Sequence, residues 1–116
     1  MDWLEELIRQ LSELSDVQYV VSADKTGAYL QGNGCTNPEE TAAILTFIGQ
    51  AGQNIGNSLG LDELQSVAVV GNKDRLLIYQ AGEYMIGLAL TEKGLLTKVE
   101  TQANRLIEDA ISTLEA

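Results

Sequence analysis

The sequence predicts an α/β protein of the α+β type, a three-layer sandwich in which helices cover both faces of a five-stranded antiparallel sheet. Two segments near the chain ends carry apolar residues at helical spacing, and five short segments rich in β-forming residues are separated by turn signals. Between them lies a long uncharged stretch with helix start and stop signals. The predicted element order is αββαβββα.

The first third of the chain is predicted to form a helix and a hairpin. Residues 2–14 place apolar residues on one side of a helix and charged residues on the other. Residues 17–23 and 28–31 are extended segments joined by Asp24-Lys25-Thr26-Gly27, a sequence typical of a turn. A glycine-rich connection over 32–36 then leads into the central helix.

The central helix is predicted to run from Asn37 to Gly60. Asn37 is a good N-cap, Pro38 suits the first helical position, and Glu40 stands where it completes a capping box. Gly60 supplies the stop. Residues 41–61 contain no ionisable side chain, although the chain has a formal net charge of -10.

At about 100° per residue, the central helix divides into three stripes. The apolar stripe consists of Ile44, Phe47, Ile48, Ala51, Ile55 and Leu59. The small stripe consists of Ala42, Leu45, Gly49, Gly52 and Gly56. The polar stripe consists of Thr46, Gln50, Gln53 and Asn57.

We expect the apolar stripe to pack on the sheet and the small stripe to meet a second helix. Each interior glycine costs roughly 0.5–1 kcal/mol relative to alanine, so a row of glycines needs a compensating close contact. The alternative is that these glycines mark bends or pack against the chain's own sheet.

The second half of the chain is predicted to form a meander and a last helix. Turn signals at 71–74 and 81–83 separate three strands, at 65–70, 75–79 and 84–90. These strands are apolar on both faces, which indicates helices on both sides of the sheet. In the strand at 84–90, bulky and small residues alternate, so its small face could receive a closely packed helix. Residues 95–114 form an amphipathic helix.

Composition restricts the class of protein. A chain of 116 residues is predicted to form one domain, residues 1–116. Its 17 acidic against 7 basic residues argue against binding a nucleic-acid backbone or an anionic membrane surface. The acidity favours a basic partner or serves solubility. We expect no secretory signal and no membrane insertion. Cys35 is the only cysteine, and a reducing, cytoplasmic setting is expected.

The sequence offers little chemistry. It contains no histidine, which excludes Ser-His-Asp and Cys-His arrangements and histidine metal sites. We therefore predict no catalytic residue, metal ligand or cofactor. The segment 32–36 lacks the third glycine of a dinucleotide-binding turn, and no P-loop motif is present. Arg75, beside a turn, is the most projecting candidate for an arginine finger, but a charged strand end is the simpler interpretation.

Several segments resemble the roadblock/dynein light chain family. They are Asp24-Lys25-Thr26-Gly27, Leu59-Gly60-Leu61-Asp62-Glu63-Leu64, Leu76-Leu77-Ile78-Tyr79, Gly87-Leu88-Ala89-Leu90 and Gly94-Leu95-Leu96. The complete last helix is similar to the prokaryotic branch, which includes regulators of the bacterial gliding-motility GTPase.

The resemblance implies a sheet order of 2-1-5-4-3, with the first and last helices on one face and the central helix on the other. It also implies a homodimer, or a heterodimer with a paralogue, in which edge strands pair and central helices lie side by side. The implied partner is a Ras-like small GTPase, which the dimer would activate without an arginine finger or simply scaffold. An uncharged edge strand at 67–70 would need such pairing on physical grounds.

The expected function is thus that of a non-enzymatic dimer whose central helices form a platform for the GTPase. The dimer interface is assigned to Ala42, Leu45, Gly49, Gly52, Gly56, Val67 and Val69. The GTPase contact is assigned to Thr46, Gln50, Gln53 and Asn57. The rival hypothesis is a small-molecule sensor with a pocket between helix and sheet, lined by Tyr19, Tyr29, Tyr84 and Met85.

Overall fold

The computed structural model of the chain describes residues 2–61 and 64–115. Its elements follow the predicted order: α1 (Trp3–Ser12), β1 (Val17–Ala23), β2 (Tyr29–Asn33), α2 (Pro38–Ser58), β3 (Ser66–Val70), β4 (Arg75–Ala81), β5 (Tyr84–Leu90) and α3 (Leu96–Glu115). Asp62 and Glu63, in the predicted connection before β3, lie outside the described residues.

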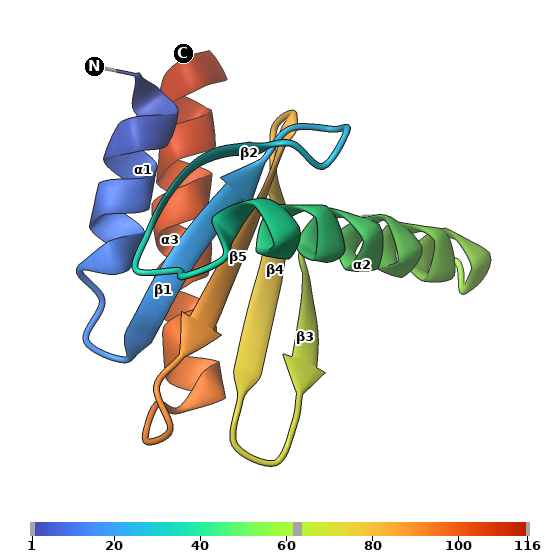
Figure 1. Cartoon of the computed structure of the whole chain (residues 1–116). Coiled ribbons are helices and arrows are strands. Elements are labelled where there is room, and N and C mark those ends of the chain that lie inside the picture. The colour runs from blue at the N-terminus through green and yellow to red at the C-terminus, as the bar shows by residue number, and fades with distance from the viewer. Residues whose placement is uncertain (1, 62–63, 116) are drawn as a thin grey trace.

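The five strands form one antiparallel sheet in the order β2-β1-β5-β4-β3. Helices α1 and α3 lie side by side on one face, and α2 crosses the other face (Figure 1). Strand β3 is an edge, paired with β4 in a register that sets Val67 opposite Ile78. The predicted sheet order and three-layer arrangement are confirmed.

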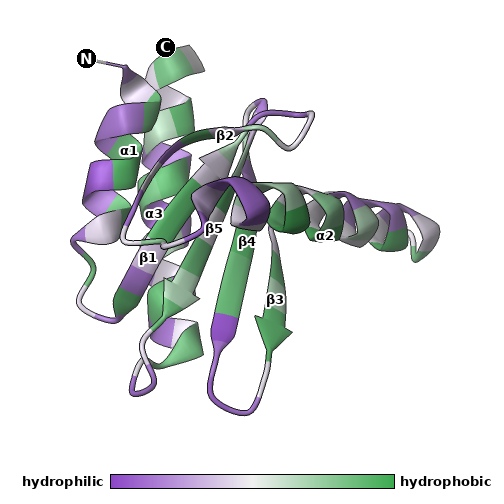
Figure 2. Cartoon of the chain, viewed as in Figure 1, coloured by the Kyte–Doolittle hydropathy of each residue, from purple (hydrophilic) through white to green (hydrophobic). Residues whose placement is uncertain are grey.

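The sheet separates two apolar clusters. The larger cluster joins α1 and α3 to one face through residues such as Leu7, Leu88 and Ala103. The smaller joins α2 to the other face through residues such as Leu45 and Met85. Figure 2 shows the central strands as largely hydrophobic and α1 as a helix with one hydrophobic and one hydrophilic side. Because the central strands are hydrophobic on both sides, both faces of the sheet are buried under helices.

The alternation in β5 decides how closely α2 approaches. Ile86 and Leu88 belong to the cluster under α1 and α3, whereas Gly87 lies on the α2 side. A Cβ placed at Gly87 would lie 2.8 Å from Leu45 Cδ2. The small face of this strand therefore receives a closely packed helix, as predicted.

The ends of α2 agree only in part with the predicted caps. Gly60 has a φ of 75°, and the N–H groups of Gly60 and Leu61 donate to the carbonyls of Asn57 (3.2 Å) and Gly56 (2.9 Å). This is the Schellman arrangement, so the predicted stop is confirmed. Asn37 is the N-cap residue, but its side chain makes no capping hydrogen bond, and the capping box is not formed.

The predicted orientation of α2 is wrong. The small stripe packs on the chain's own sheet: Ala42 and Leu45 are fully buried. A Cβ at Gly49 would lie 2.7 Å from Met85 Cε, and one at Gly52 would lie 2.4 Å from Val67 Cγ2. Bulkier residues would hold the helix away from these strands. The glycines are thus compensated by contact with the sheet, the alternative that the sequence left open.

Much of the apolar stripe, expected in the core, is exposed instead, although Ile48 is partly buried against the cluster between α2 and the sheet. The exposed fractions are 50% for Ile44, 74% for Phe47, 60% for Ile55 and 71% for Leu59. Because the small stripe occupies the sheet side of the helix, these four residues of the apolar stripe lie outside the chain's own core.

Replacing Gly52 with alanine should lower the free energy of unfolding by about 1–2 kcal/mol, because overpacking against Val67 outweighs the gain in helix propensity. Gly56→Ala is the matched control. Its Cβ would lie 3.7 Å from Leu64 Cβ, an ordinary contact, so it should be neutral or stabilise by up to about 1 kcal/mol. Urea unfolding at one protein concentration measures both, and equal midpoints for the two variants would contradict this packing.

Candidate functional site

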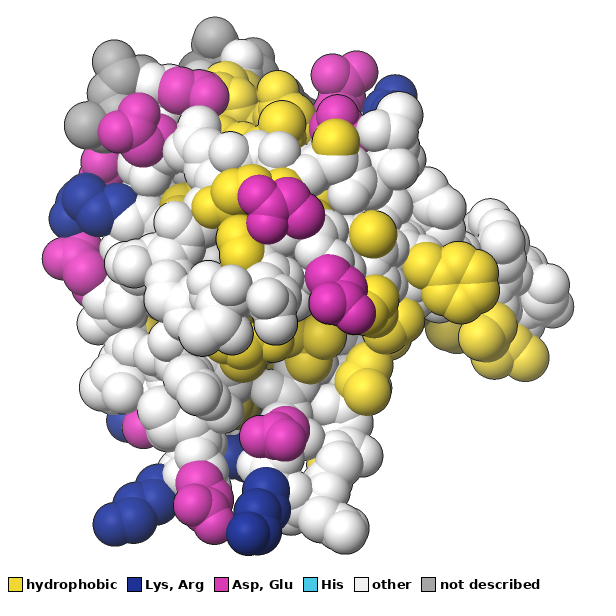
Figure 3. Space-filling view, in the orientation of Figure 1, with side chains coloured by type: hydrophobic (Ala, Val, Ile, Leu, Met, Phe, Trp, Pro, Cys, Tyr) yellow, Lys and Arg dark blue, Asp and Glu magenta, His cyan; other side chains and the backbone are white. Residues whose placement is uncertain are grey.

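The candidate site is built on α2, which extends past the edge of the sheet. Figure 1 shows the C-terminal part of the helix projecting beyond β3. Figure 3 shows hydrophobic side chains gathered on this projecting part and on the sheet beside it. A contiguous exposed apolar surface of this kind marks an interaction site in a folded protein.

Strand β3 forms an open edge of the sheet next to this helix. β3 pairs with β4 on one side, and no strand of the described residues pairs with its other side. Its residues 66–70 include neither a charge nor a proline, and Val69 and Val70 are 40% and 62% exposed. Such an edge exposes unpaired N–H and C=O groups together with apolar side chains, which favours pairing with another strand.

The sheet face beside α2 is hollowed near this edge. A hollow of about 430 Å³ is lined mainly by Tyr19, Val69, Leu76 and Ala89. Tyr19 is partly buried here, and this burial raises the pKa of its hydroxyl, so the side chain is neutral at physiological pH. The hollow is also lined by Asp74 and Arg75, so its apolar part lies beside two charged side chains.

The polar stripe lies on the opposite flank of α2 and is largely engaged within the chain. Thr46 is 5% exposed, and its Oγ1 donates to the Ala42 carbonyl at 2.8 Å. Its predicted role as a partner contact is therefore contradicted.

Two glutamines of this stripe tie α2 to the hairpin turns. Gln50 Nε2 donates to the Lys25 carbonyl at 3.3 Å, in the β1–β2 turn. Gln53 Nε2 donates to Gln80 Oε1 at 3.0 Å, and Gln80 Nε2 donates to the Gly82 carbonyl at 3.3 Å. Asn57 is exposed. Contact with a partner stays a prediction for Gln50, Gln53 and Asn57. The hydrogen bonds that tie the two glutamines to the hairpins are a feature of the fold.

The whole sheet and α2 fall within one known sequence pattern. Residues 4–91 match the profile of the Roadblock/LC7 domain. The chain belongs to the Roadblock/LC7 domain family. The predicted family membership is thus confirmed. A comparison with curated proteins finds no match.

Solved structures place this Roadblock/LC7 chain beside bacterial proteins. It is similar to a Roadblock/LC7 domain from Streptomyces avermitilis (16% identity, TM-score 0.79, 100% of this chain and 98% of that chain covered). It is also similar to the gliding protein MglB from Thermus thermophilus (21%, 0.80, 98% and 90%) and to MglB from Myxococcus xanthus (16%, 0.83, 97% and 88%). The likeness extends past residue 91, where the family profile ends, into α3.

The residues proposed for a sensor pocket in this Roadblock/LC7 domain are brought together only in part: Tyr84 and Met85 line one hollow of about 230 Å³, whereas Tyr19 lines another. Tyr19, Tyr29 and Met85 lie on the α2 side of the sheet, whereas Tyr84 packs on Trp3 on the other side, with ring centroids 5.6 Å apart. The cavity between α2 and the sheet, next to Gly49, measures about 10 Å³, room for one water molecule at most. The geometry therefore does not favour a ligand in this place.

The described residues of this family member offer neither a metal-binding cluster nor a projecting Arg75. They contain no group of three or more His, Cys, Asp or Glu side chains able to hold a metal ion. Arg75 does not project: its Nη2 donates to the carbonyls of Thr91 (2.7 Å) and Glu92 (3.2 Å). Within the described ranges, no helix is both long and apolar enough to cross a membrane.

The apolar stripe is the feature of α2 that sequence reasoning assigned to the wrong side of the helix. A signal for the correct orientation was present, because Gly49, Gly52 and Gly87 supply the small surfaces of a close helix–sheet contact. A glycine in one layer makes room for a side chain of the other layer, so the glycine-bearing side of the helix is expected to face the sheet and the larger apolar residues to lie on its other sides.

The turn that Gln50 contacts generates a pH prediction. Asp24 Oδ1 accepts hydrogen bonds from Thr26 Oγ1 (2.6 Å) and from the N–H groups of Thr26 (2.8 Å) and Ala28 (3.1 Å), and these bonds lower the pKa of Asp24. A carboxylate whose folded pKa is lowered contributes stability above its unfolded pKa, about 3.9, and loses it as the pH falls through the folded value.

Asp24→Asn should therefore destabilise the protein more at pH 7 than at pH 3, since the charge that strengthens these bonds is partly neutralised in acid. Urea unfolding of the wild type and the variant at both pH values measures the difference. A penalty that is equal or larger at pH 3 would contradict this account of the turn.

Proposed function

We propose that this chain is the protomer of a dimeric, non-enzymatic regulator or scaffold of a Ras-like small GTPase, acting in the cytoplasm. The observation that carries the proposal is the exposed apolar stripe of α2 projecting past an open strand edge. Membership of the Roadblock/LC7 family supports it, because the resemblance implies both dimerisation and a small GTPase as partner.

The proposed dimer is symmetric and uses two features at once. Antiparallel pairing of the two β3 strands about a two-fold axis joins the sheets, and each α2 then extends over the partner. The flank of α2 that carries Ile44, Ile55 and Leu59 meets the same flank of the other helix and the hollow beside Val69. The small stripe is no longer assigned to the dimer contact, because it is buried within the protomer. Val67 and Val69 remain proposed contacts at the strand edge.

Burial of this surface contributes favourable free energy toward the association of two protomers. Full burial of a Val, Leu or Ile side chain contributes about 1.5–3 kcal/mol. In each protomer a partner could bury three side chains of α2 and two of β3, each between 40% and 71% exposed. These are Ile44, Ile55, Leu59, Val69 and Val70. Strand pairing adds backbone hydrogen bonds that satisfy the open edge.

The proposed action on the GTPase involves no arginine finger from this chain. Of the three arginines, Arg75 is bound to backbone carbonyls, Arg9 forms ion pairs with Glu6 and Glu13, and Arg105 lies on α3, on the sheet face opposite α2. If hydrolysis is accelerated, the dimer acts by repositioning the GTPase's own catalytic groups, as the resemblance to gliding-motility regulators implies. Scaffolding without acceleration is the other form of the same function.

Ile55→Asp should convert the dimer to a monomer, because it introduces a charge into the proposed helix–helix contact. Light scattering during size exclusion should then give the protomer mass of 12.5 kDa instead of twice that value. Leu95→Asp is the matched control: Leu95 is 65% exposed and lies just before α3, so the mass should not change. A monomeric wild type, or a dimeric Ile55→Asp variant, would contradict the proposed dimer.

Binding to a small GTPase should depend on the intact dimer. The immobilised wild type and the Ile55→Asp variant can be exposed to extract of the source organism with GDP or with a non-hydrolysable GTP analogue. We expect a Ras-like GTPase among the proteins that the wild type retains and the variant does not, confirmed by calorimetry with the purified GTPase. Retention of no small GTPase in either nucleotide state would sink the proposed function.

A further inference from the structure

We propose that the groove between α3 and β3, on the sheet face opposite α2, docks an amphipathic helix of another protein that carries apolar and basic residues. The inference goes beyond the proposed function, because it concerns a different face of the chain and a different partner. The groove belongs to a single protomer, so it does not depend on the proposed pairing of two chains.

Two helices are too few to cover all five strands on this face. Strands lie about 4.8 Å apart and a helix is about 10 Å wide, so each helix covers about two strands. Helix α1 packs on β1 and β2, and α3 packs on β4. In Figure 1 both helices stand toward the β1 side of the sheet, whereas β3 lies at the opposite margin. The face of β3 that is turned away from α2 is therefore left open.

The side chains of β3 agree with an open face. Val67 contacts the position of Gly52, so it points toward α2. Because side chains alternate along a strand, Ala68 and Val70 point to the other face, the one that carries α3. Ala68 is exposed, and Val70 is 62% exposed. The floor of the groove is thus a small, apolar strip beside α3.

One side of α3 forms the wall of the groove. Ile107 is 5% exposed and marks the side of the helix that faces the sheet. At about 100° per residue, Glu100, Asn104 and Glu108 lie about 20–100° from Ile107 in one direction. Leu106, which packs on the larger apolar cluster, lies about 100° away in the other direction. Two carboxylates and an amide therefore follow one another along the wall.

The groove deepens where β3 begins. A hollow of about 540 Å³ lies there between α3, β4 and the start of β3. Its lining combines apolar side chains, which can receive an aliphatic group, with polar side chains, which can accept hydrogen bonds. The lining includes Leu64, Gln65, Tyr79, Asn104, Glu108 and Ile111.

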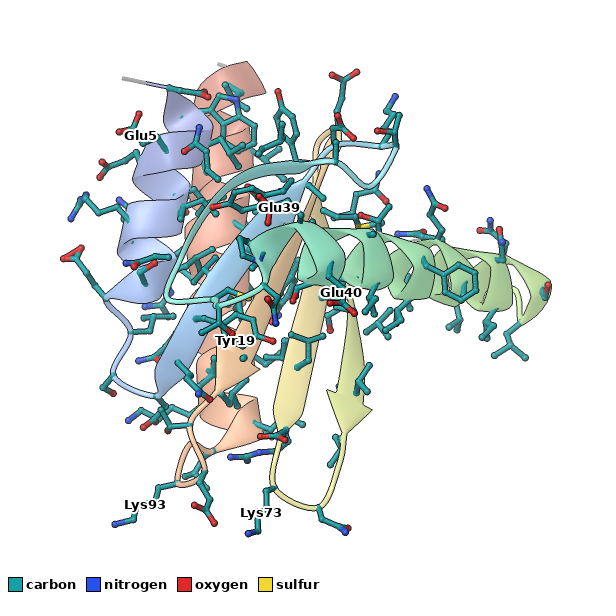
Figure 4. All side chains as sticks on the ribbon, viewed as in Figure 1. Glu5, Tyr19, Glu39, Glu40, Lys73 and Lys93 are labelled. Atoms are coloured by element: carbon teal, nitrogen blue, oxygen red, sulfur yellow. The ribbon has the colours of Figure 1, made fainter. Side chains whose placement is uncertain are left out.

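The charge of the wall favours a basic partner. Glu108 is exposed and Glu100 is half-buried, and among the described residues neither carboxylate forms an ion pair. Figure 4 shows the labelled Lys73 and Lys93 at turns at the other end of the sheet from this hollow. Lys or Arg beside the apolar stripe of a docked helix gains two carboxylate partners, whereas an acidic helix is repelled by a chain of net charge -10.

A helix fits the groove better than an extended segment does. Packed helices have axes about 8–10 Å apart, and a helix at that distance from α3, on the side away from α1, lies over β3. It would form a third helix in the layer of α1 and α3 and cover the open strand. Its apolar stripe would contact Ala68 and Ile111, in the manner of an amphipathic helix bound in a groove.

The first test pans a phage library of random peptides of about 16 residues, about 24 Å long as helices, against the immobilised wild type. Recovered sequences should carry apolar residues at helical spacing together with several Lys or Arg. No enrichment, recovery of acidic sequences, or recovery of sequences whose apolar residues alternate as in a strand would overturn the inference.

The second test measures the affinity of the most enriched peptide, made synthetically, by calorimetry. Glu100→Lys/Glu108→Lys should weaken binding about tenfold or more, because it reverses the charge of the wall. Glu5→Lys/Asp109→Lys is the matched control: both side chains are exposed, lie outside the groove and give the same change in net charge. Equal losses of affinity in the two variants overturn the inference, because binding would then follow overall charge alone.

The third test needs no variant and locates the same peptide by its effect on the backbone amide NMR signals of the isotope-labelled wild type. The largest shifts should fall in residues 66–70 of β3 and 100–111 of α3. Shifts concentrated in α2 or on the outer side of α1 overturn the inference.

Discussion

The fold depends on the close approach of α2 to the sheet, which glycine makes possible on both sides of the contact. Gly49 and Gly52 in the helix and Gly87 in β5 each leave a space that a side chain of the opposite layer fills. The filling groups are Met85, Val67 and Leu45. The free energy that three glycines cost in a helix and a strand is offset by van der Waals contact across the interface.

This contact also determines where the function lies. A helix has a limited circumference, and here its sheet-facing side is occupied by small residues, so larger apolar residues appear on the other sides. The polar flank is held by amide hydrogen bonds to the hairpin turns. What is left is an apolar flank and an outward aromatic ring on a helix that extends past the sheet, the surface that the proposed dimer uses.

Much of the fold could be predicted from the sequence, because local chemistry determines it. The Asp24–Gly27 turn, the stop at Gly60 and the alternation in β5 each have one sufficient physical cause, and the structure shows all three features. The orientation of α2 could not be predicted from amphipathicity, which identifies an apolar face without saying whether the chain or a partner covers it. Thr46 was misassigned for a related reason: a buried threonine satisfies its hydroxyl on the preceding turn, here on the Ala42 carbonyl, and leaves no trace in the pattern.

The open edge of β3 also bears on the behaviour of the chain in the cell. An unpaired protomer presents a bare strand of valines beside an exposed helix, which is the template on which aberrant strand addition and aggregation begin. Its strong negative charge keeps such protomers apart by repulsion, and this protection weakens as the salt concentration rises. For the proposed dimer, the acidity of the chain is thus a safeguard in the interval between synthesis and assembly, when no strand covers the edge.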